Sequence, residues 1–254
     1  MERNEPSVDI ILPNYNSEKF IQETLDSILQ QTYKNWRLII VDDNSSDNSP
    51  TKISSFKRDN INFIRLGKKK GAAFCRNLGM RISNSKYVSF IDSDDYWSKE
   101  KLKKQISFME EFNHNFTYTD YIPFLYKKDK KIFKKKIIAP SSFSYEEFIN
   151  DTSIGTSSVI VKRSIIGTKK FTKTKILEDY FFKCQLLKKN SIAIKFGECS
   201  MFYRISADSL QSNKFKNLYW LWHINKNYNH LSILQNLKSI LFIAISSIKK
   251  YGIK

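Results

Sequence analysis

Four short apolar runs separated by helix-like segments constrain this chain more than any other feature of its sequence. The runs lie at residues 8–12, 36–41, 61–66 and 87–91. Residues 17–29 carry apolar side chains at helical spacing, and residues 71–82 also fit a helix. Parallel strands are buried on both faces and need crossover helices, so they read as continuous apolar runs. The order predicts an α/β fold with a central, mostly parallel sheet flanked by helices.

The second half of the chain predicts a different set of elements. A helix is expected after Ser98, and residues 116–138 resemble a hairpin with its turn near residues 128–131. Two further strands and several helices should follow. We expect strands at residues 156–162 and 192–196, a helix at 178–188, and helices from Phe215 onward.

Composition limits where the protein works and what it contacts. Cys75, Cys184 and Cys199 form no C-x-x-C pair, so we expect neither a zinc site nor a disulfide framework. The polar residues 1–7 lack the apolar core of a signal peptide, which favours a cytoplasmic location. The net charge of +18 favours polyanionic partners such as anionic lipid headgroups or a phosphorylated glycan carrier. A lysine-rich composition without any such partner is the alternative interpretation.

A cluster of carboxylates follows the fourth apolar run directly. Asp92, Ser93, Asp94 and Asp95 stand where a strand of the predicted sheet ends. Carboxylates so close together repel one another, and a divalent cation between them and a diphosphate relieves that repulsion. The cluster therefore predicts a cation site at the carboxyl edge of the sheet, where open α/β sheets bind ligands.

Polar turns after the first two runs predict a nucleoside site. Pro13, Tyr15 and Asn16 follow the first run, and Asp42 and Asp43 follow the second. Turns after adjacent parallel strands lie side by side, where an aromatic ring and carboxylates can hold a base and a ribose. The alternative is that these are ordinary turns, in which Asp47 or Ser49 caps the next helix.

Four segments together resemble family 2 glycosyltransferases of the GT-A fold, the type that builds bacterial polysaccharides and lipopolysaccharides. They are residues 8–16, 39–47, 71–79 and 87–95, in the order and spacing of that family. The resemblance covers the first hundred residues and thins beyond them. Asn14 is a small departure, since many relatives have threonine at this position.

The resemblance implies roles for single residues. Tyr15 would stack near the donor base, Asp43 would accept the imide N–H of uracil, and Asp94 and Asp95 would hold Mn²⁺ or Mg²⁺. Arg204 would neutralise the leaving diphosphate from a loop at residues 203–210, although a salt bridge is an alternative role. The expected nucleotide-sugar site comprises Pro13, Tyr15, Asn16, Asp42, Asp43, Arg76, Asp92, Ser93, Asp94 and Arg204.

The acidic pair Glu178–Asp179 is the expected catalytic pair. In the family, one such carboxylate is the general base, and we expect Asp179 to fill that role, with Glu178 as the alternative. Acidic residues in the first turn of a helix are also favoured by the helix dipole, which is the structural explanation for the same pair.

The resemblance divides the chain into a GT-A domain at residues 1–210 and a basic, apolar, helical tail at residues 211–254. Within the domain, residues 1–100 would bind the nucleotide sugar and residues 101–210 the acceptor. The longest apolar stretch, residues 239–248, is too short to span a bilayer. Two interpretations of the tail remain: peripheral contact with the anionic inner face of the plasma membrane, or packing on the domain.

The expected activity is that of a metal-dependent hexosyl- or N-acetylhexosaminyltransferase. It would invert the sugar of a UDP-sugar on transfer to a hydroxyl of a glycan or lipid-linked glycan in cell-surface polysaccharide biosynthesis. The alternative is a non-catalytic protein that binds sugar nucleotides or polyanions. No nucleic-acid partner is expected, because the sequence has neither an aromatic RNP-like strand nor a basic recognition helix.

Overall fold

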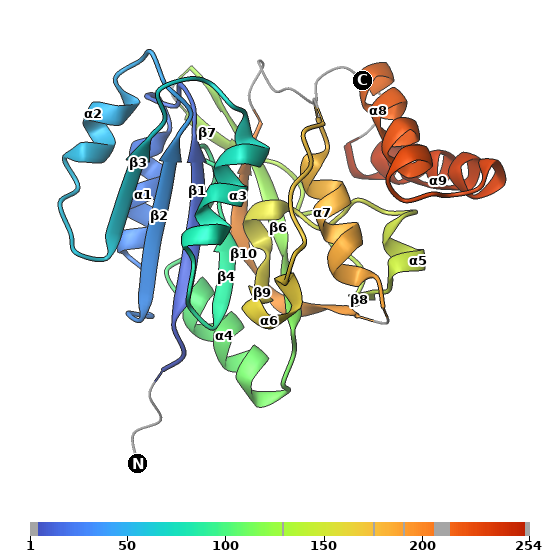
Figure 1. Ribbon diagram of the computed structural model, residues 1–254, viewed down its shortest axis with the longest axis horizontal. Helices are drawn as coiled ribbons and strands as arrows, with labels where there is room; N and C mark the ends of the chain where they lie inside the picture. The colour runs from blue at the N-terminus through green and yellow to red at the C-terminus, as the bar shows by residue number, and fades with distance from the viewer. Residues whose placement is uncertain (1–4, 129, 175, 190, 206–213, 252–254) are drawn as a thin grey trace.

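The computed structural model describes residues 5–128, 130–174, 176–189, 191–205 and 214–251. The first part of the chain alternates strands and helices (Figure 1). In order, it contains β1 (Val8–Asn14), α1 (Ile21–Leu29), β2 (Trp36–Asp42), α2 (Ser49–Ser54), β3 (Ile61–Arg65), α3 (Ala72–Ile82) and β4 (Tyr87–Phe90).

The second part of the chain mixes short strands with helices. It contains β5 (Tyr96–Trp97), α4 (Lys101–Glu111), β6 (Phe116–Lys127), β7 (Lys130–Phe133), β8 (Ser142–Phe143), α5 (Tyr145–Phe148), the 3₁₀-helix η1 (Thr156–Ser158), β9 (Ile160–Lys162), α6 (Arg163–Ile166), α7 (Glu178–Leu187), β10 (Ala193–Arg204), α8 (Lys214–Asn227) and α9 (Ile233–Tyr251).

One ten-stranded sheet joins the two parts. Eight of its strands follow the order β3-β2-β1-β4-β9-β6-β10-β5, while β7 pairs with β6 and β8 pairs with β10 outside this order. The strands β3, β2, β1 and β4 are all parallel, as the apolar runs predicted. At β9 the direction reverses, since β9 pairs antiparallel with both β4 and β6. The predicted α/β fold with a mostly parallel sheet is confirmed.

Alternate residues of β1 pack on opposite faces of the sheet. Ile10 lies in the same buried cluster as Ile21 and Leu25 of α1. Ile11 faces the other way, into a cluster that contains Ala73 of α3. Figure 1 shows α1 and α3 on the two faces of the sheet. Both faces of β1 are therefore covered, which explains its unbroken apolar sequence.

Pro13 lies inside β1, whereas the sequence predicted that the strand would end at Leu12. Pro13 is in register with Val41 of β2, and the strand continues to Asn14. The pairing of β1 with β4 stops at Ile11. Since backbone groups of alternate residues point to alternate neighbours, the missing N–H of Pro13 faces the side where pairing has already ended.

Gly79 lets α3 lie close against the sheet. A Cβ atom at this position would lie 2.6 Å from Cγ2 of Ile11, which is fully buried. We expect Gly79→Ala to lower the free energy of unfolding by about 1–3 kcal/mol, because overpacking must displace the strand or the helix. Urea denaturation measures the change, and Gly67→Ala, where a Cβ would meet nothing within 4 Å, is the matched control.

The second half departs from the predicted elements in two places. Residues 156–158 form the helix η1 instead of the start of a strand, and the strand β9 covers only Ile160–Lys162. β10 runs over twelve residues, past the predicted end at residue 196. The hairpin was predicted correctly, since β6 and β7 pair antiparallel around a turn at Lys128. Lys128 adopts a φ of 48°, in the left-handed region.

The two C-terminal helices pack on the rest of the chain. Asn225 of α8 accepts a hydrogen bond from the Tyr180 hydroxyl of α7 at 2.8 Å. Ile224 and Ile243 belong to the same buried cluster as α7. Of the two interpretations of the tail, packing on the domain is thus observed. The predicted boundary at residue 210 falls within residues 206–213, outside the described residues.

Candidate active site

Three polar or acidic turns that carry expected site residues lie at one edge of the sheet. The carboxyl ends of β1, β2 and β4 point to the same end of the molecule, where α3 begins (Figure 1). The parallel arrangement therefore brings together the polar turn after β1, the acidic turn after β2 and the acidic loop after β4.

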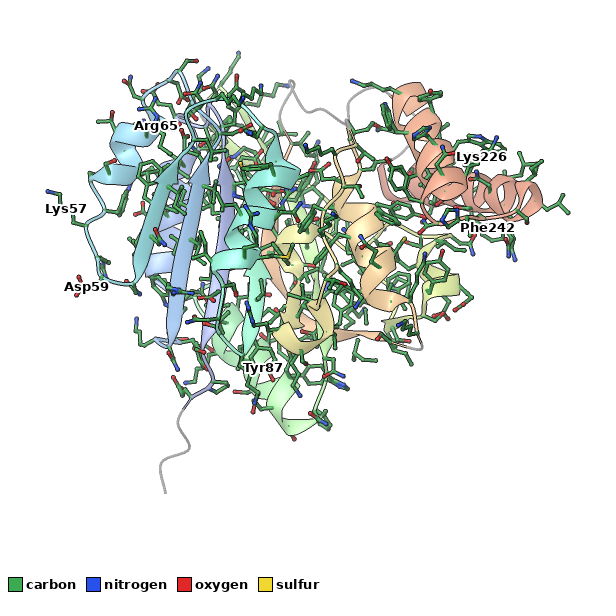
Figure 2. All side chains as sticks on the ribbon, in the orientation of Figure 1. Lys57, Asp59, Arg65, Tyr87, Lys226 and Phe242 are labelled. Carbon is green, nitrogen blue, oxygen red and sulfur yellow. The ribbon has the colours of Figure 1, made fainter. Side chains whose placement is uncertain are left out.

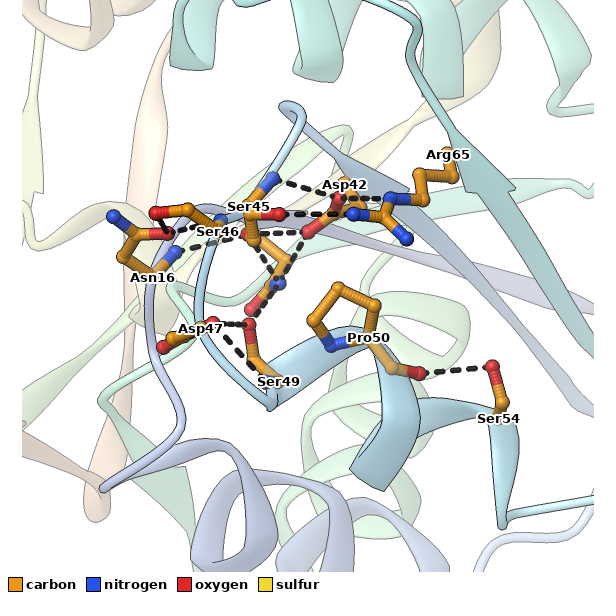
Figure 3. A network of polar contacts seen from close by, with 10 residues as sticks. Asn16, Asp42, Ser45, Ser46, Asp47, Ser49, Pro50, Ser54 and Arg65 are labelled. Atoms are coloured by element: carbon orange, nitrogen blue, oxygen red, sulfur yellow. Dashed lines mark hydrogen bonds and ion pairs between the residues drawn. The ribbon is translucent and has the colours of Figure 1, made fainter.

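A network of hydrogen bonds ties the first two turns together (Figure 3). Nδ2 of the buried Asn14 donates to Oδ1 of Asp42 at 2.6 Å and to Oγ of Ser49 at 3.1 Å. The backbone N–H of Asn16 donates to Oγ of Ser45 at 2.9 Å. The two turns consequently form one rigid unit.

Asp42 is one of the residues that hold the two turns together. It is fully buried, and its carboxylate accepts the Ser45 N–H at 3.0 Å and pairs with Arg65 at 3.6 Å. In this structure the carboxylate of Asp42 is used to shape the turn, and its contact with the nucleotide stays a prediction. The alternative role of Asp47 is also seen, since its carboxylate accepts the N–H of Ser49, the first residue of α2, at 3.0 Å.

Asp43 connects the second turn to the start of α3. Its two carboxylate oxygens accept the backbone N–H groups of Lys70 and Gly71 at 2.6 and 2.8 Å. Gly71 has a φ of 92°, a conformation that residues with a side chain rarely adopt. The two bonds fix the orientation of the Asp43 carboxylate at the edge of the sheet.

Tyr15 is the exposed aromatic residue of this edge. It is 42% exposed, and Nζ of Lys69 lies 3.6 Å from the centre of its ring. Asn16 beside it is exposed and has a φ of 47°, whereas Pro13 is buried within β1. An exposed ring with a cation over it offers a face for stacking and a charge for phosphate.

Arg76 of α3 joins the two halves of the site. Its guanidinium lies 2.6 Å from Oδ1 of Asp92 and 2.8 Å from Oε1 of Glu178. Burial opposes the charged form, but the two carboxylates outweigh it and raise the pKa of Arg76. Phe171 covers the guanidinium at 5.3 Å. A permanently charged side chain thus links the loop after β4 to the start of α7.

The loop after β4 carries three carboxylates, of which Asp92 and Asp94 are partly buried and Asp95 is fully buried. Burial and the neighbouring Asp92 raise the pKa of Asp94 to about 6. Burial, followed by Asp94 and Asp92, raises the pKa of Asp95 well above its usual range. Thr24 of α1 holds the loop by donating to the carbonyls of Ser93 and Asp95 at 3.0 and 2.8 Å.

The two neighbouring hydroxyls of η1 hold the two predicted acidic centres. Ser157 Oγ donates to Oδ2 of Asp95 at 2.6 Å, and Thr156 Oγ1 donates to Oδ2 of Asp179 at 2.7 Å. Ser157 also accepts the backbone N–H of Asp92 at 3.0 Å. Asp95 and Asp179, which lie far apart in the sequence, are therefore joined through two adjacent residues.

The two carboxylates at the start of α7 have opposite electrostatic environments. Burial alone would raise the pKa of Asp179, but Lys183 at 2.9 Å, with Thr156, lowers it below the usual range. For Glu178, burial and the adjacent Asp179 raise the pKa despite the ion pair with Arg76. Asp179 is consequently held in its ionised form.

Arg204 is enclosed within the protein. Its side chain is 5% exposed and forms an ion pair with Glu23, and Nε donates to the carbonyl of Asp94 at 2.8 Å. Its backbone N–H donates to Oδ1 of Asp95 at 3.0 Å. The alternative role, a salt bridge, is thus observed, and the contact with a diphosphate stays a prediction. Residues 206–210 of the predicted loop lie outside the described residues.

The acidic loop offers oxygen ligands of the kind that Mn²⁺ and Mg²⁺ prefer. Asp94 is partly exposed, and repulsion from its neighbours favours a bound cation, whereas both oxygens of Asp95 already accept protein hydrogen bonds. Within the described residues no group of three His, Cys, Asp or Glu side chains is arranged to hold a metal. The loop therefore fits an ion that takes its remaining ligands from a diphosphate and water.

Several contacts were missed from the sequence. Thr156, Ser157 and Lys183 hold the acidic residues, and Lys69 covers Tyr15. The only sequence signal for Thr156 and Ser157 was their place in the predicted strand at residues 156–162. Lys183 stands four residues after Asp179, a spacing that places two side chains on the same helical face.

Comparisons with known proteins agree with the fold. The model of Glycosyl transferase family 2 matches residues 9–210. The chain is 32% identical over 247 residues to the putative teichuronic acid biosynthesis glycosyltransferase TuaG of Bacillus subtilis, covering 96% of this chain and 97% of that protein. It is 34% identical over 241 residues to the UDP-Glc:alpha-D-GlcNAc-diphosphoundecaprenol beta-1,3-glucosyltransferase WfgD of Escherichia coli, covering 94% and 93%.

Two solved structures are similar in fold. TarS 1–349 of S. aureus, in complex with UDP-GlcNAc, superposes with a TM-score of 0.71 at 17% identity, covering 96% of this chain and 73% of that one. The mannosyltransferase PcManGT of Pyrobaculum calidifontis, in complex with GDP-Man and Mn2+, gives a TM-score of 0.66 at 14% identity, with 99% and 77% covered. At these identities the likeness concerns the fold, which is GT-A.

Proposed function

The chain belongs to glycosyl transferase family 2, and on that basis we propose that it transfers a sugar from UDP-sugar to a hydroxyl of a lipid-linked glycan during bacterial polysaccharide synthesis. The name of WfgD gives a UDP-sugar as donor and a diphosphoundecaprenol-linked sugar as acceptor, and TarS was solved with UDP-GlcNAc. PcManGT binds GDP-Man, so the fold alone does not select the base. Asp43, an acceptor of hydrogen bonds, favours the imide N–H of uracil.

One observation carries the proposal: the donor-side and acceptor-side carboxylates are held by adjacent residues. Ser157 binds Asp95 and Thr156 binds Asp179. In the proposed reaction, Asp179 accepts the proton of the acceptor hydroxyl as its oxygen attacks the anomeric carbon opposite the diphosphate, which inverts the sugar. Asp94, beside Asp95, would hold Mn²⁺ or Mg²⁺, which supplies charge stabilisation for the departing diphosphate.

The donor side of the proposed site uses the remaining residues of the edge. Tyr15 would stack on the base and Asp43 would accept its imide N–H. Arg76 would hold Asp92 and Glu178 in place beside the diphosphate. Pro13, Asn16 and Ser93 would contribute through the shape of the turns that carry these side chains.

A basic groove supports a phosphate-bearing acceptor. It has a volume of about 1120 Å³ and includes Phe171, the residue that covers Arg76. The groove would attract the diphosphate of a lipid-linked glycan presented at the inner face of the plasma membrane. Its cationic lining residues are Arg81, Lys86, Lys162, Arg163, Lys169, Lys170 and Lys173.

A donor screen tests the reaction. We expect release of UDP from one or more UDP-sugars, dependent on Mn²⁺ or Mg²⁺, and faster release when an undecaprenyl-diphosphate sugar is added. The same screen with GDP-sugars is the control for the base. If UDP-sugars bind but no nucleotide diphosphate is released with any acceptor, the protein is a sugar-nucleotide-binding protein instead of an enzyme.

The pH dependence of turnover tests the role of Lys183. Because Lys183 lowers the pKa of Asp179, the base stays ionised in acid, and Lys183→Met should raise that pKa. We expect the acid limb of kcat to move to higher pH by at least about one unit in the variant. Nζ of Lys183 also donates to the carbonyl of Ile154 at 2.7 Å, so the substitution could affect folding. Thermal unfolding of the variant is the control for this effect. An unshifted limb would contradict the assignment of Asp179 as the base.

A further inference from the structure

The last helix of the chain, α9, carries large apolar side chains on its outer surface. Leu234 is 79% exposed, Ile233 68% and Leu241 59%. Exposed apolar residues at 234, 237, 241, 245 and 248 follow one another at spacings of three and four residues, so they lie along one stripe of the helix, with Ile233 and Phe242 beside it. The outer stripe of α9 consists of Ile233, Leu234, Leu237, Leu241, Phe242, Ile245 and Ile248.

The inner side of the same helix is partly polar. Asn236 and Ser239 are buried, and Nδ2 of Asn236 donates to the carbonyl of Trp222 at 3.1 Å. Oγ of Ser239 accepts from Nδ2 of Asn225 at 2.9 Å. Ile243 also packs inward. A helix of a water-soluble domain normally buries its apolar face, so packing on this chain does not account for the outer stripe.

The sequence of α8 and α9 is basic, and one of its lysines, Lys238, lies beside the outer stripe. Residues 209–254 contain seven lysines, namely 214, 216, 226, 238, 249, 250 and 254, and no aspartate or glutamate. Lys238 is exposed on α9, with Nζ 5.8 Å from the ring centre of Phe242. Figure 2 shows Lys226 and Phe242 at the end of the molecule formed by α8 and α9.

We propose that the outer stripe of α9 inserts into the headgroup region of an anionic bilayer, with the helix parallel to the surface. An apolar stripe beside lysines matches an interface that is apolar inside and anionic outside. A second copy of the chain would bring the same lysines together, which disfavours self-association. In the described part of the chain, no helix is long and apolar enough to cross a membrane.

A lipid-linked acceptor, as in the proposed function, would lie in a membrane. The proposal that α9 binds a bilayer is nevertheless argued from the exposed stripe and the charge of the helix alone. The test is co-sedimentation of the full chain with vesicles of phosphatidylglycerol and phosphatidylcholine, compared with pure phosphatidylcholine. We expect Leu237→Gln/Leu241→Gln to bind the anionic vesicles at least about tenfold more weakly. Ile192→Gln, at a residue outside α9 that is as exposed as Leu237 at 52%, should bind like wild type.

A second variant, at Lys238, tests the electrostatic part of the proposed membrane binding. Lys238→Glu should weaken binding to the anionic vesicles by roughly fivefold or more, with little change on phosphatidylcholine. Wild-type binding should fall as salt is raised. If the double leucine variant binds vesicles like wild type, the proposal is overturned. A dimer of the wild type that the double variant dissociates, as seen by light scattering, would overturn it as well.

Donor hydrolysis without vesicles separates this proposal from the proposed function. All three variants should release UDP at the wild-type rate, because none of the substituted residues belongs to the site. Normal hydrolysis without vesicle binding would overturn only the membrane surface. Vesicle binding without hydrolysis of any nucleotide sugar would overturn only the proposed reaction.

Discussion

Asp179→Asn is expected to lower kcat by about a thousandfold and to leave the protein folded. A positioned general base contributes roughly 10²–10⁴ to the rate, and an amide cannot accept the proton of the acceptor hydroxyl. Asparagine keeps the shape of the side chain, and its carbonyl oxygen can still accept from Thr156 Oγ1, which lies 2.7 Å from the carboxylate. Turnover under saturating donor and acceptor measures the effect, and the KM of the donor should change little.

Glu178→Gln is the matched control for that variant. Glu178 pairs with Arg76 at 2.8 Å, so its replacement should weaken donor binding more than it lowers kcat. Thermal unfolding of both variants shows whether the start of α7 is intact. If Glu178→Gln lost turnover while Asp179→Asn kept it, Glu178 would be the base, and the assignment of the pair would have to be exchanged.

Asp95→Asn is expected to abolish most turnover while making the protein more stable at neutral and alkaline pH. The loop would lose a negative charge beside the proposed cation, at a cost to kcat of about 10²–10³. The asparagine can still accept the Arg204 N–H and can donate to Ser157 Oγ, so no buried partner is left unpaired. Activity is measured with saturating Mn²⁺, and stability is measured with a chelator present.

The sign of the stability change follows from the raised pKa of Asp95. A carboxyl group whose pKa is higher in the folded state favours folding in acid and loses that contribution as pH rises through the folded pKa. The Tm of Asp95→Asn should therefore exceed that of wild type at pH 8, and the difference should vanish near pH 4. A variant with full metal-dependent turnover would contradict the placement of the cation site.

The parallel half of the fold could be predicted because its signals are local. Each strand from β1 to β4 is a short apolar run, and the intervening helices have their own spacing or glycine signals. The antiparallel half depends on contacts between distant segments. The η1 residues directly precede the β-branched run at residues 159–161, so the whole segment resembled one strand, but Thr156 and Ser157 bind Asp179 and Asp95 instead of continuing the sheet. Tertiary contacts overrode local preference there.

The sequence could predict the position of the candidate site, at the carboxyl edge of the sheet, but not the contacts between its side chains. The sequence placed Asp42, Asp43 and Asp92 at the ends of strands, and the sheet brings these ends together. It could not show that Asp42 turns inward to Asn14 and Ser45, or that Arg204 is enclosed beside Glu23. Such choices depend on which neighbours are within reach in three dimensions, and adjacent carboxylates look alike in sequence.

The short η1 helix has a consequence for how new substrates arise on this scaffold. Thr156 and Ser157 are consecutive, so a backbone movement that shifts one of the carboxylates they hold would shift the other. The positions of the two carboxylates are then difficult to change one at a time, and substitutions at Thr156 or Ser157 should lower activity. Variation in sugar or linkage would instead have to arise in the walls around the pair, where side chains can be exchanged independently.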